Sequence, residues 1–341
     1  VGSIDLQAAD LVPPKMTGSW IQDGAVDVPA IENPTIHYNE SLDAASVNPT
    51  SVQLRNNLTG LDVAGAAKLS ADGMSIVFDP AFSLKGETTY TLNITPDIKD
   101  LAGNGWAEGL SLTFTTAPSF SADIVNQGSA SAPYVVSSGR YTDITISGSY
   151  VVFNGLVAAD SISLSNGSVL THAYATTSSK ARLSVEALTM SVDASSRIDV
   201  SSRGYLGGWR SGNNSNWGRT WGNITSGGSD YTTGASYGGL GGRPSNYNVN
   251  AVYGDLTNPN ELGSGGGGSN SGSPYHGGNG GGLVRIQAET LTLDGDILAD
   301  GMGATYRGAG SGGGIRLDVG TLKGSGTLAA RGGTSSNAGS G

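Results

Sequence analysis

The sequence of 341 residues contains no cysteine and only three histidines, and 13% of its residues are charged. Without cysteine the chain has neither disulfide bonds nor thiolate metal sites, which excludes zinc fingers and cysteine nucleophiles. No apolar run approaches the roughly 20 residues that a membrane-spanning helix needs, and no signal peptide is recognisable. We therefore expect no membrane insertion.

Basic residues are also scarce. Residues 1–118 carry 14 acidic and five basic residues, and residues 119–341 carry 14 acidic and 13 basic ones. Neither part has the basic character of a nucleic-acid-binding domain, so we expect no nucleic-acid partner. The histidines lie far apart at positions 37, 172 and 276, and no G-x-S-x-G sequence indicates a hydrolytic triad. Matches to the dinucleotide motif at Gly263 and Gly324 precede no helical pattern, which argues against nucleotide binding.

Residues 10–118 show short strands with period-two apolar residues and turn signals between them, as expected for a β-sandwich. The strongest strand segments are "PTIHYNESL", "SVQLRN", "MSIVFDP", "TYTLNITPDIKD" and "LSLTFTT". In their order and spacing these segments resemble the bacterial Ig-like domain first described in S-layer proteins. The resemblance implies a spacer or display module without chemistry, and residues 1–9 look like the end of an upstream module.

Glycine is abundant, at 55 residues, and one glycine-containing segment is repeated. The segment "GGGLVRIQAETLTLDGDILADG" begins at Gly280 and recurs as "GGGIRLDVGTLKGSGTLAARGG" from Gly312, a period of 32 residues, and an earlier copy begins near residue 181. Short strands in consecutive copies without helices predict that residues 119–341 form a β-solenoid, specifically a right-handed parallel β-helix. The glycines are expected to form tight corners, which need positive φ and close approach of one backbone to another. An antiparallel sandwich or barrel is the alternative architecture.

Residues 204–280 interrupt the copies with 23 glycines, three tryptophans and six tyrosines. Such aromatic density is unlike a disordered linker, so we expect this insertion to fold against the solenoid. Flat rings stack on sugar faces while neighbouring amides bind hydroxyls, which predicts a contact surface for a glycan or a surface protein. The predicted contact residues are Trp209, Trp217, Trp221, Tyr231, Tyr237, Tyr247, Tyr253, Tyr275 and His276. The alternative is that these rings only cover a glycine-rich sheet that is poor in side chains.

Two loops offer the oxygen ligands that calcium prefers. The first holds Asp255, Asn258, Asn260 and Glu261, and calcium bound there is the one cofactor that we consider. The second, less favoured, holds Asp97, Asp100 and Asn104. Turn capping by the same side chains is the alternative in both loops.

Carboxylates gathered on one face of a β-helix serve acid–base catalysis in polysaccharide lyases and hydrolases. The candidates are Asp199, Asp294, Asp296, Asp300 and Asp318, of which Asp294 and Asp296 are expected to share a strand face. The corresponding positions in the other copies hold Val192 or Asp193 and Gly324 or Ser325, so no catalytic ladder is predicted. We expect a protein without enzymatic activity.

Residues 180–341 also resemble a glycine-rich segment of very large bacterial secreted and surface proteins, including YD-repeat (Rhs-type) proteins, on "DASSRIDVSSRGYLGG", "GGNGGGLVRIQAETLTLDG" and "GSGGGIRLDVGTLKGSGT". The chain starts with Val and stops within the repeat, so we expect an internal fragment of a larger extracellular or cell-surface protein, with neighbouring modules as partners. The expected function is structural or adhesive. The alternatives are a polysaccharide-binding or polysaccharide-degrading module and a shell or plug element of a YD-repeat toxin.

Overall fold

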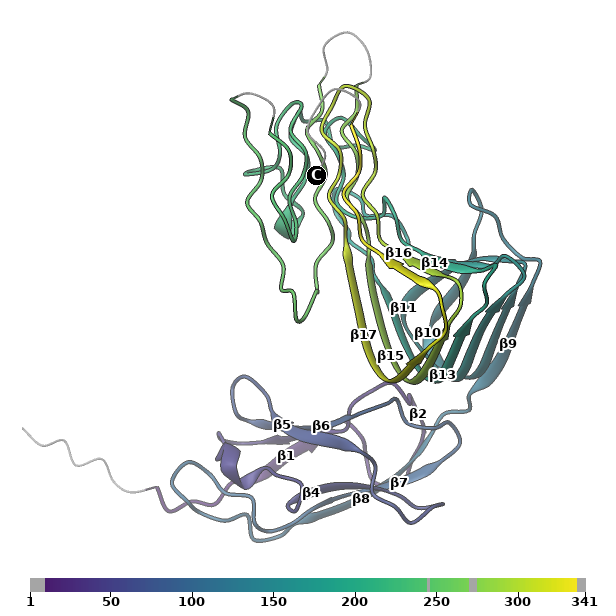
Figure 1. Ribbon diagram of the computed structural model, residues 1–341. Coiled ribbons are helices and arrows are strands. Elements are labelled where there is room, and N and C mark those ends of the chain that lie inside the picture. The colour runs from purple at the N-terminus through teal and green to yellow at the C-terminus, as the bar shows by residue number, and fades with distance from the viewer. Residues whose placement is uncertain (1–9, 244–245, 270–274, 336–341) are drawn as a thin grey trace, which may run out of the picture. The chain divides into compact units, whose positions relative to one another are not determined.

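The computed structural model describes residues 10–243, 246–269 and 275–335, and the chain divides after Phe120 into two compact units (Figure 1). Both units are built from strands, and the helical residues that are described form two short 3-10 turns, Ala44–Ser46 and Trp221–Asn223. Among the described residues, no helix has the length and apolarity to cross a membrane. The all-β prediction is therefore confirmed.

The first unit is a sandwich of two four-stranded sheets, in the orders β1-β3-β6-β5 and β2-β8-β7-β4. The β2–β8 pair is parallel and the other pairs are antiparallel. The five segments that sequence alternation predicts as strands are confirmed as β3, β4, β6, β7 and β8. The bounds are β1 (Met16–Ser19), β2 (Ala25–Val28), β3 (Thr35–Tyr38), β4 (Val52–Asn56), β5 (Gly65–Leu69), β6 (Ser75–Pro80), β7 (Thr89–Ile94) and β8 (Leu110–Thr116).

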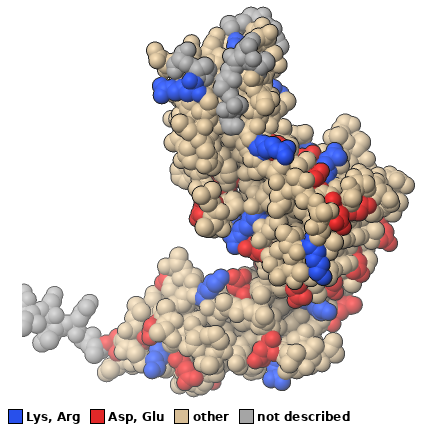
Figure 2. Space-filling model, viewed as in Figure 1, with Lys and Arg blue, Asp and Glu red and all other residues tan. Residues whose placement is uncertain are grey.

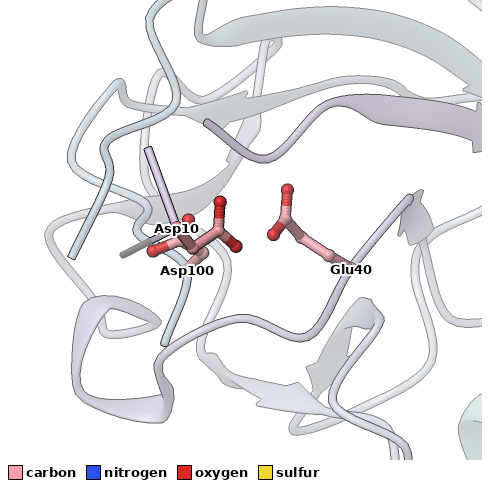
Figure 3. A group of neighbouring side chains, drawn as sticks. All are labelled: Asp10, Glu40 and Asp100. Carbon is pink, nitrogen blue, oxygen red and sulfur yellow. The ribbon is translucent and has the colours of Figure 1, made fainter. Parts of the chain in front are cut away.

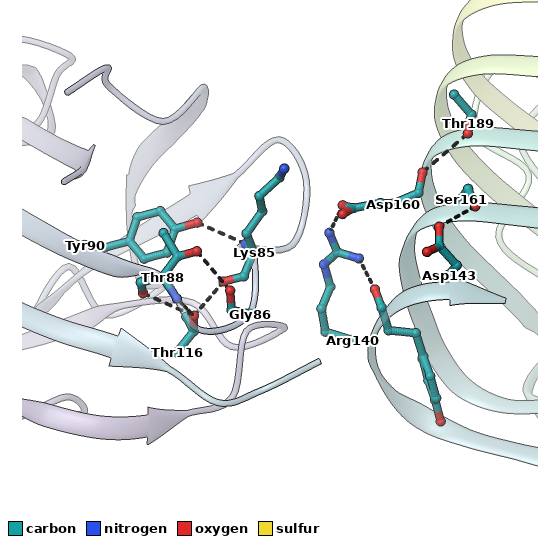
Figure 4. Close-up of polar contacts among 11 residues, drawn as sticks. Lys85, Gly86, Thr88, Tyr90, Thr116, Arg140, Asp143, Asp160, Ser161 and Thr189 are labelled. Atoms are coloured by element: carbon teal, nitrogen blue, oxygen red, sulfur yellow. Dashed lines mark hydrogen bonds and ion pairs between the residues drawn. The ribbon is translucent and has the colours of Figure 1, made fainter. Parts of the chain in front are cut away.

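Alternation of side chains across each strand gives this unit its core. In β7, Tyr90, Leu92 and Ile94 point inward and are 2% exposed, while the residues between them face outward. The Tyr90 ring stacks on Phe114, and its hydroxyl accepts a hydrogen bond from the backbone N–H of Lys85 at 3.0 Å. Thr116 donates to the Lys85 carbonyl, so the turn before β7 is fixed by side chains of two strands (Figure 4).

In the second unit, every strand pair from β10 to β18 whose register is known is parallel. The antiparallel sandwich or barrel alternative is therefore wrong for these strands. The strands form one near-closed sheet with two halves. In one half the neighbouring strands are the long ones, in the order β11-β13-β15-β17, and in the other half they are the short ones, in the order β12-β14-β16-β18. The bounds are β9 (Phe120–Val125), β10 (Tyr134–Ser147), β11 (Tyr150–Ser165), β12 (Val169–Thr171), β13 (Leu183–Val192), β14 (Arg197–Asp199), β15 (Leu283–Leu293), β16 (Asp296–Leu298), β17 (Gly314–Lys323) and β18 (Thr327–Ala329).

Each turn of the chain thus adds one long and one short strand, a unit called a coil below. Ladders of inward side chains run from coil to coil, such as Val185, Ile286 and Leu317, and the residues between the apolar positions face outward. On the outer side Arg140 binds Asp160, and Ser161 donates to Asp143 at 2.6 Å (Figure 4).

The coil period differs by one residue from the predicted one. Val284 pairs with Ile315 and Ile286 with Leu317, which sets the period at 31 residues instead of 32. The sequence alignment placed the leading glycines of the two copies opposite each other, so that Gly314 matched Gly282. In the structure Gly314 pairs with Leu283, which shortens the period by one residue. A Cβ at Gly314 would lie 2.8 Å from the Leu283 side chain, so the second copy starts its strand with glycine where the first has leucine.

A glycine-rich bundle extends from the coils and contains almost no regular strand (green and yellow loops in Figure 1). Its segments run side by side and exchange backbone hydrogen bonds: Gly263 donates to Gly281, Gly265 to Arg219, Gly266 to Gly278 and Gly268 to Asn216. Two residues that are three apart, such as Gly263 and Gly266, thus bond the same neighbouring segment. This is the periodicity of a polyproline II helix, which has three residues per turn. The bundle comprises residues 204–208, 216–220, 228–236, 263–269, 277–282, 299–303, 308–313 and 330–333.

The close backbone approach predicted for these glycines is confirmed, whereas the predicted positive φ is wrong for the run from Gly263 to Gly268. Between residues 204 and 314, the described glycines with positive φ are Gly212, Gly222, Gly227 and Gly254, none of which lies in the run from Gly263 to Gly268. Glycine is required there by close approach, since a Cβ at Gly265 or Gly266 would lie under 3.0 Å from the backbone of Leu206 or Gly308. The interior of the bundle therefore consists of glycine backbones packed directly against one another.

His172 follows β12 and is fully buried. Its Nδ1 donates to the carbonyl of Ala173 at 2.7 Å, and its Nε2 accepts from the backbone N–H of Leu283 at 3.3 Å. This arrangement requires the neutral imidazole, and burial lowers the pKa of His172 from 6.5 to about 4.

We expect the second unit to lose stability as the pH falls from 7 to 5. In this range the unfolded chain, with a His172 pKa near 6.5, binds more protons than the folded chain, so acid favours unfolding. The expected loss is about 2 kcal/mol. Urea titrations at both pH values measure it, and His172→Gln, which cannot be protonated, should remove most of the difference; an equal pH dependence in that variant contradicts the assignment.

Candidate functional site

The predicted contact residues do not form one surface. Trp221 and Tyr247 are 62% and 40% exposed, whereas Tyr237 is 8% exposed. The others are partly buried: Trp209, Trp217, Tyr231, Tyr253, Tyr275 and His276. They separate into rings that fasten the bundle internally and rings that gather at its far end.

Four tyrosines and an arginine form a tyrosine–arginine cluster: Tyr231, Tyr247, Tyr275, Tyr306 and Arg307. The guanidinium of Arg307 lies between two rings, 4.8 Å from the centroid of Tyr231 and 4.6 Å from that of Tyr275. Tyr247 stacks on Tyr231 at 5.0 Å, and Tyr306 meets Tyr275 edge to face at 6.1 Å. The outer rings are accessible, with Tyr247 and Tyr306 40% and 48% exposed.

The cluster lies at the end of the bundle that is farthest from the coils. Residues 299–313 leave β16 and return to β17, so Tyr306 and Arg307 sit at the midpoint of the excursion. Tyr275 begins the return toward β15 and forms a bridge with Ser269, and the backbone of Asp230, beside Tyr231, bonds that of Asn248, beside Tyr247. Bundle segments from different parts of the sequence thus bring the rings together.

Arg307 is the electrostatic centre of the cluster. Its side chain is buried, with the residue 8% exposed, and its Nη1 donates to the carbonyl of Tyr306 at 2.6 Å. Its Nε has no hydrogen-bond partner among the described residues, and no ion pair to it is seen there. Ring faces compensate part of the charge through cation–π contacts. A buried cation between two rings that lead to exposed rings is chemically suited to stack a sugar and attract an anionic oxygen.

A second group of tyrosines fastens the base of the bundle. The Tyr205 hydroxyl donates to Glu261 at 2.8 Å, and the Tyr253 hydroxyl donates to the carbonyl of Leu262 at 2.6 Å. Burial raises the pKa of Tyr205, Tyr237 and Tyr253. Here the alternative that rings cover a glycine-rich structure describes what Tyr237 and Tyr253 do.

The loop from Trp209 to Trp217 is held by one internal hydrogen bond and by contacts with His276 and Gly277. Trp209 Nε1 donates to Asn216 at 2.6 Å, His276 Nδ1 contacts the carbonyl of Trp209, and Arg210 Nε donates to the carbonyl of Gly277 at 2.8 Å. These contacts fix the loop, and Trp221 is the most exposed of the three tryptophans in residues 204–280.

The structure does not assemble the first predicted calcium loop into an oxygen cage. Asp255 accepts hydrogen bonds from Thr257 and Asn258 within the turn, which lowers its pKa. The Asn258 oxygen accepts from Arg316, and the Asn260 oxygen accepts from Arg182 and Arg285. Glu261 binds Lys180 and Tyr205. The protein's own cations and donors thus occupy these oxygens, as in the alternative of a turn network.

In the second predicted calcium loop, Asp97, Asp100 and Asn104 do not point their oxygens at one shared site. Asp100 accepts from the backbone of Ala102 and Asn104 at 2.8 and 2.9 Å, and Asp97 accepts from Thr95. Asp100 instead meets Asp10 and Glu40, with one carboxylate oxygen of each within 4.8 Å of the others (Figure 3). Their hard oxygen atoms are of the kind that a divalent cation binds. Because Asp10 and Glu40 are far away in the sequence, spacing alone does not indicate this group.

The predicted catalytic carboxylates are not gathered for acid–base work. Asp199, Asp300 and Asp318 each pair with an arginine, namely Arg197, Arg331 and Arg316. Asp294 lies in the turn after β15 while Asp296 begins β16, so the expectation that they share a strand face is wrong. Asp294 accepts from the backbone of Ser325 at 3.3 Å in this turn.

Solved structures match about a third of this chain. Surface layer protein SbsC, domains 1–6, is 18% identical and aligns over 31% of this chain and 14% of that one, with a TM-score of 0.25. The N-terminal part of the bacterial S-layer protein SbsC is 16% identical over 34% and 28% of the two chains, with a TM-score of 0.25. E. coli alpha-2-macroglobulin is 14% identical over 34% and 7%, with a TM-score of 0.27.

The chain therefore spans at most 28% of the length of these three proteins. No curated protein matches it. A family model matches residues 10–116, and through these residues the first unit of the chain is similar to the family described as "Bacterial Ig-like domain".

Proposed function

We propose that the chain is a non-catalytic structural and adhesive module of a large bacterial surface or secreted protein. The Ig-like unit acts as a spacer, and the second unit is a right-handed β-solenoid that displays the glycine-rich bundle. The tyrosine–arginine cluster at the far end of the bundle contacts a glycan. The Ig-like match supports the surface location. The modular setting is proposed on the sequence resemblance of residues 180–341 to segments of YD-repeat proteins.

The observation that carries the contact role is the environment of Arg307. Arg307 is 8% exposed and stacked between two rings. Burial of its charge costs free energy unless hydrogen bonds or an opposite charge replace the water that it has lost. The exposed rings of Tyr247 and Tyr306 flank it, and aromatic rings with a polar end are favoured where a surface meets a ligand. The bundle below is rigid because each of its segments bonds several neighbours, so the rings are held in place before a ligand arrives.

Binding to a panel of immobilised bacterial and host glycans tests the proposal. We expect Tyr306→Ala and Arg307→Met to weaken binding of any positive glycan about tenfold or more, since central aromatic and arginine residues dominate such contacts. The matched control is Trp20→Ala, which removes an exposed ring, 47% accessible, from the first unit. Trp221→Ala removes a 62% exposed ring outside the cluster and reports whether that part of the insertion also contacts the glycan.

Equal loss in the Trp20 and Tyr306 variants, or no glycan bound by the parent protein, contradicts the contact role. Release of reducing ends or unsaturated uronates from a polysaccharide, abolished by Asp296→Asn, would overturn the non-catalytic assignment in favour of a polysaccharide-degrading module. The sequence that surrounds this chain in its gene distinguishes a surface adhesin from a shell or plug element of a YD-repeat toxin.

A further inference from the structure

Three arginines meet on the outer face of the long strands of the second unit and are called the arginine group below. Arg285 of β15 pairs in register with Arg316 of β17, and Arg182 directly precedes β13. Neighbouring strands of a sheet lie about 4.8 Å apart, so these side chains start from adjacent coils. Charged groups are otherwise sparse on this unit, since most of its surface in Figure 2 carries neither sign.

An amide oxygen holds two of these arginines where a carboxylate is usual. The Asn260 side-chain oxygen accepts from Nη1 of Arg285 at 2.9 Å and from Nη1 of Arg182 at 3.4 Å. Arg316 pairs with Asp318 at 2.6 Å, but neither Arg182 nor Arg285 forms an ion pair within the described ranges of the chain. Two cations thus share one neutral oxygen.

The like charges lie close enough to oppose one another. Burial lowers the pKa of Arg285, and the charges of Arg316 and Arg182 lower it further, while Asp318 acts in the opposite direction. A nearby opposite charge favours the charged form of each arginine, so an anionic ligand relieves this repulsion. Arg–carboxylate pairs are also among the strongest hydrogen-bonded contacts, because two parallel N–H groups can bind both oxygens.

A cavity of about 240 Å³ opens beside the arginine group, and Arg182 and Arg285 line it. Glu186, Gln287 and Asp318 line it as well. These three residues are in register across β13, β15 and β17, two positions along the strand from Arg285, which is about 6.6 Å. A ligand in the cavity therefore meets guanidinium donors in one row and carboxylate and amide groups in the next.

The cavity opens on the side of the coils and lies within their stack. β13 has β11 and β15 as neighbours, and β15 has β13 and β17. Cavities for drug-sized ligands measure about 300–1,000 Å³, so this smaller one suits a single ring of a longer chain. The two carboxylates disfavour a bare oxyanion but accept hydrogen bonds from hydroxyls. A sugar that carries its own carboxylate matches both rows.

We propose that this cavity binds one sugar acid of an acidic glycan. Its carboxylate lies on Arg182 and Arg285, and its hydroxyls point toward Glu186 and Gln287. Asn260 takes Nη1 of each arginine and is the hydrogen-bond partner of both in the part of the chain that the structure describes, so their other donors bind the ligand. The site shares no residue with the tyrosine–arginine cluster, and the two can be tested independently.

Isothermal titration calorimetry of the 341-residue protein with oligogalacturonate, oligomannuronate and hyaluronan fragments tests the proposal. We expect at least one to bind, and its methyl ester, which keeps the hydroxyls and removes the charge, to bind about tenfold or more weakly. Arg285→Gln keeps an amide donor for Asn260 and removes the charge, and should weaken binding of the acid to the same extent. Arg197→Gln makes the same change on β14, in the short-strand half of the sheet, and should bind like the parent.

Two further variants separate recognition from folding. Arg285→Lys keeps the charge without the planar fork, so we expect an affinity between those of the parent and Arg285→Gln. If circular dichroism shows that Arg285→Gln is unfolded, Arg182→Gln makes the test at an exposed position.

The proposal is overturned if none of the three acids binds, if acid and ester bind equally, or if the folded glutamine variant binds like the parent. Displacement of the oligosaccharide by equimolar sulfate overturns the sugar assignment and leaves a simple anion site. Binding that is lost in Tyr306→Ala and unchanged in Arg285→Gln places the acidic glycan on the tyrosine–arginine cluster, in which case the proposed function holds and this inference fails.

Discussion

Gly308→Ala is expected to destabilise the second unit by about 3 kcal/mol or more. A Cβ at Gly308 would lie under 3.0 Å from the carbonyl of Thr233 and from the backbone nitrogen of Gly267. These are backbone atoms of other segments of the bundle, and they are hydrogen-bonded to each other. No rotamer change relieves the overlap, so the segments must move apart and lose hydrogen bonds.

Urea unfolding followed by tryptophan fluorescence measures the loss, because three of the five tryptophans lie in residues 204–280. Hydrogen exchange of peptides from residues 261–269 localises it. Gly239→Ala is the matched control, since a Cβ there meets nothing within 4 Å and the residue does not have positive φ. It should leave stability unchanged or raise it slightly. If both variants unfold at the same urea concentration, close backbone packing is not what requires glycine at position 308.

Asn250→Ala is expected to cost about 3 to 4 kcal/mol. Asn250 is 1% exposed, and its amide serves several segments of the bundle. Its oxygen accepts from the Ser236 backbone at 2.7 Å and the Ser229 hydroxyl at 2.8 Å. Its nitrogen donates to the carbonyls of Ser236 and Ala251 and lies 3.2 Å from the hydroxyls of Thr220 and Ser264. Alanine leaves these buried partners without their hydrogen bonds.

The same fluorescence titration checks this prediction, with Asn214→Ala as the control at an exposed asparagine. Asn250→Asp separates shape from hydrogen bonding, since it keeps the size of the side chain but replaces the donor by an acceptor. We expect the aspartate variant to be at least as unstable as the alanine variant at neutral pH. Wild-type stability in Asn250→Asp is the result that contradicts a donor role for this amide.

Local pattern was enough to predict the strands of the first unit. Period-two alternation in "SIVF" and "YTLNI" identifies β6 and β7, and Asp72 with Gly73 marks the turn between β5 and β6. In the second unit the repeat predicted parallel strands, because consecutive copies without helices leave few other solutions. The period was wrong by one residue, since leading glycines align less specifically than the buried ladder of Val284 and Ile315.

The bundle could not be predicted by the same reasoning. Glycine has no side chain, so runs such as Gly265–Gly268 carry no apolar period that identifies a partner. Their neighbours, at residues 206–208, 216, 230 and 308, are contacted through backbone atoms and leave no complementary side chains in the sequence. Of the two reasons expected for glycine, positive φ and close backbone approach, only close approach requires glycine in this run.

Tyr306 and Arg307 of the tyrosine–arginine cluster were not predicted, although their spacing in the sequence could have indicated them. Tyr306 and Arg307 lie 31 residues after Tyr275 and His276, and glycine follows each pair. The strand register shows that 31 is the coil period, so these pairs occupy equivalent places in successive coils. With the period taken as 32, the equivalence is lost. Contacts among Tyr231, Tyr275 and Arg307 join separate segments, and spacing within one segment does not reveal them.

The backbone interior of the bundle has a thermodynamic consequence. Exposure of apolar surface raises the heat capacity on unfolding, whereas exposure of peptide groups lowers it. Unfolding the coils exposes aliphatic ladders, but unfolding the bundle exposes chiefly peptide groups. Its heat-capacity increment per residue should therefore fall below the usual 12 to 15 cal/mol/K. The stability of the bundle then varies less with temperature than that of the coils, so cold weakens the coils before it weakens the glycine segments that they carry.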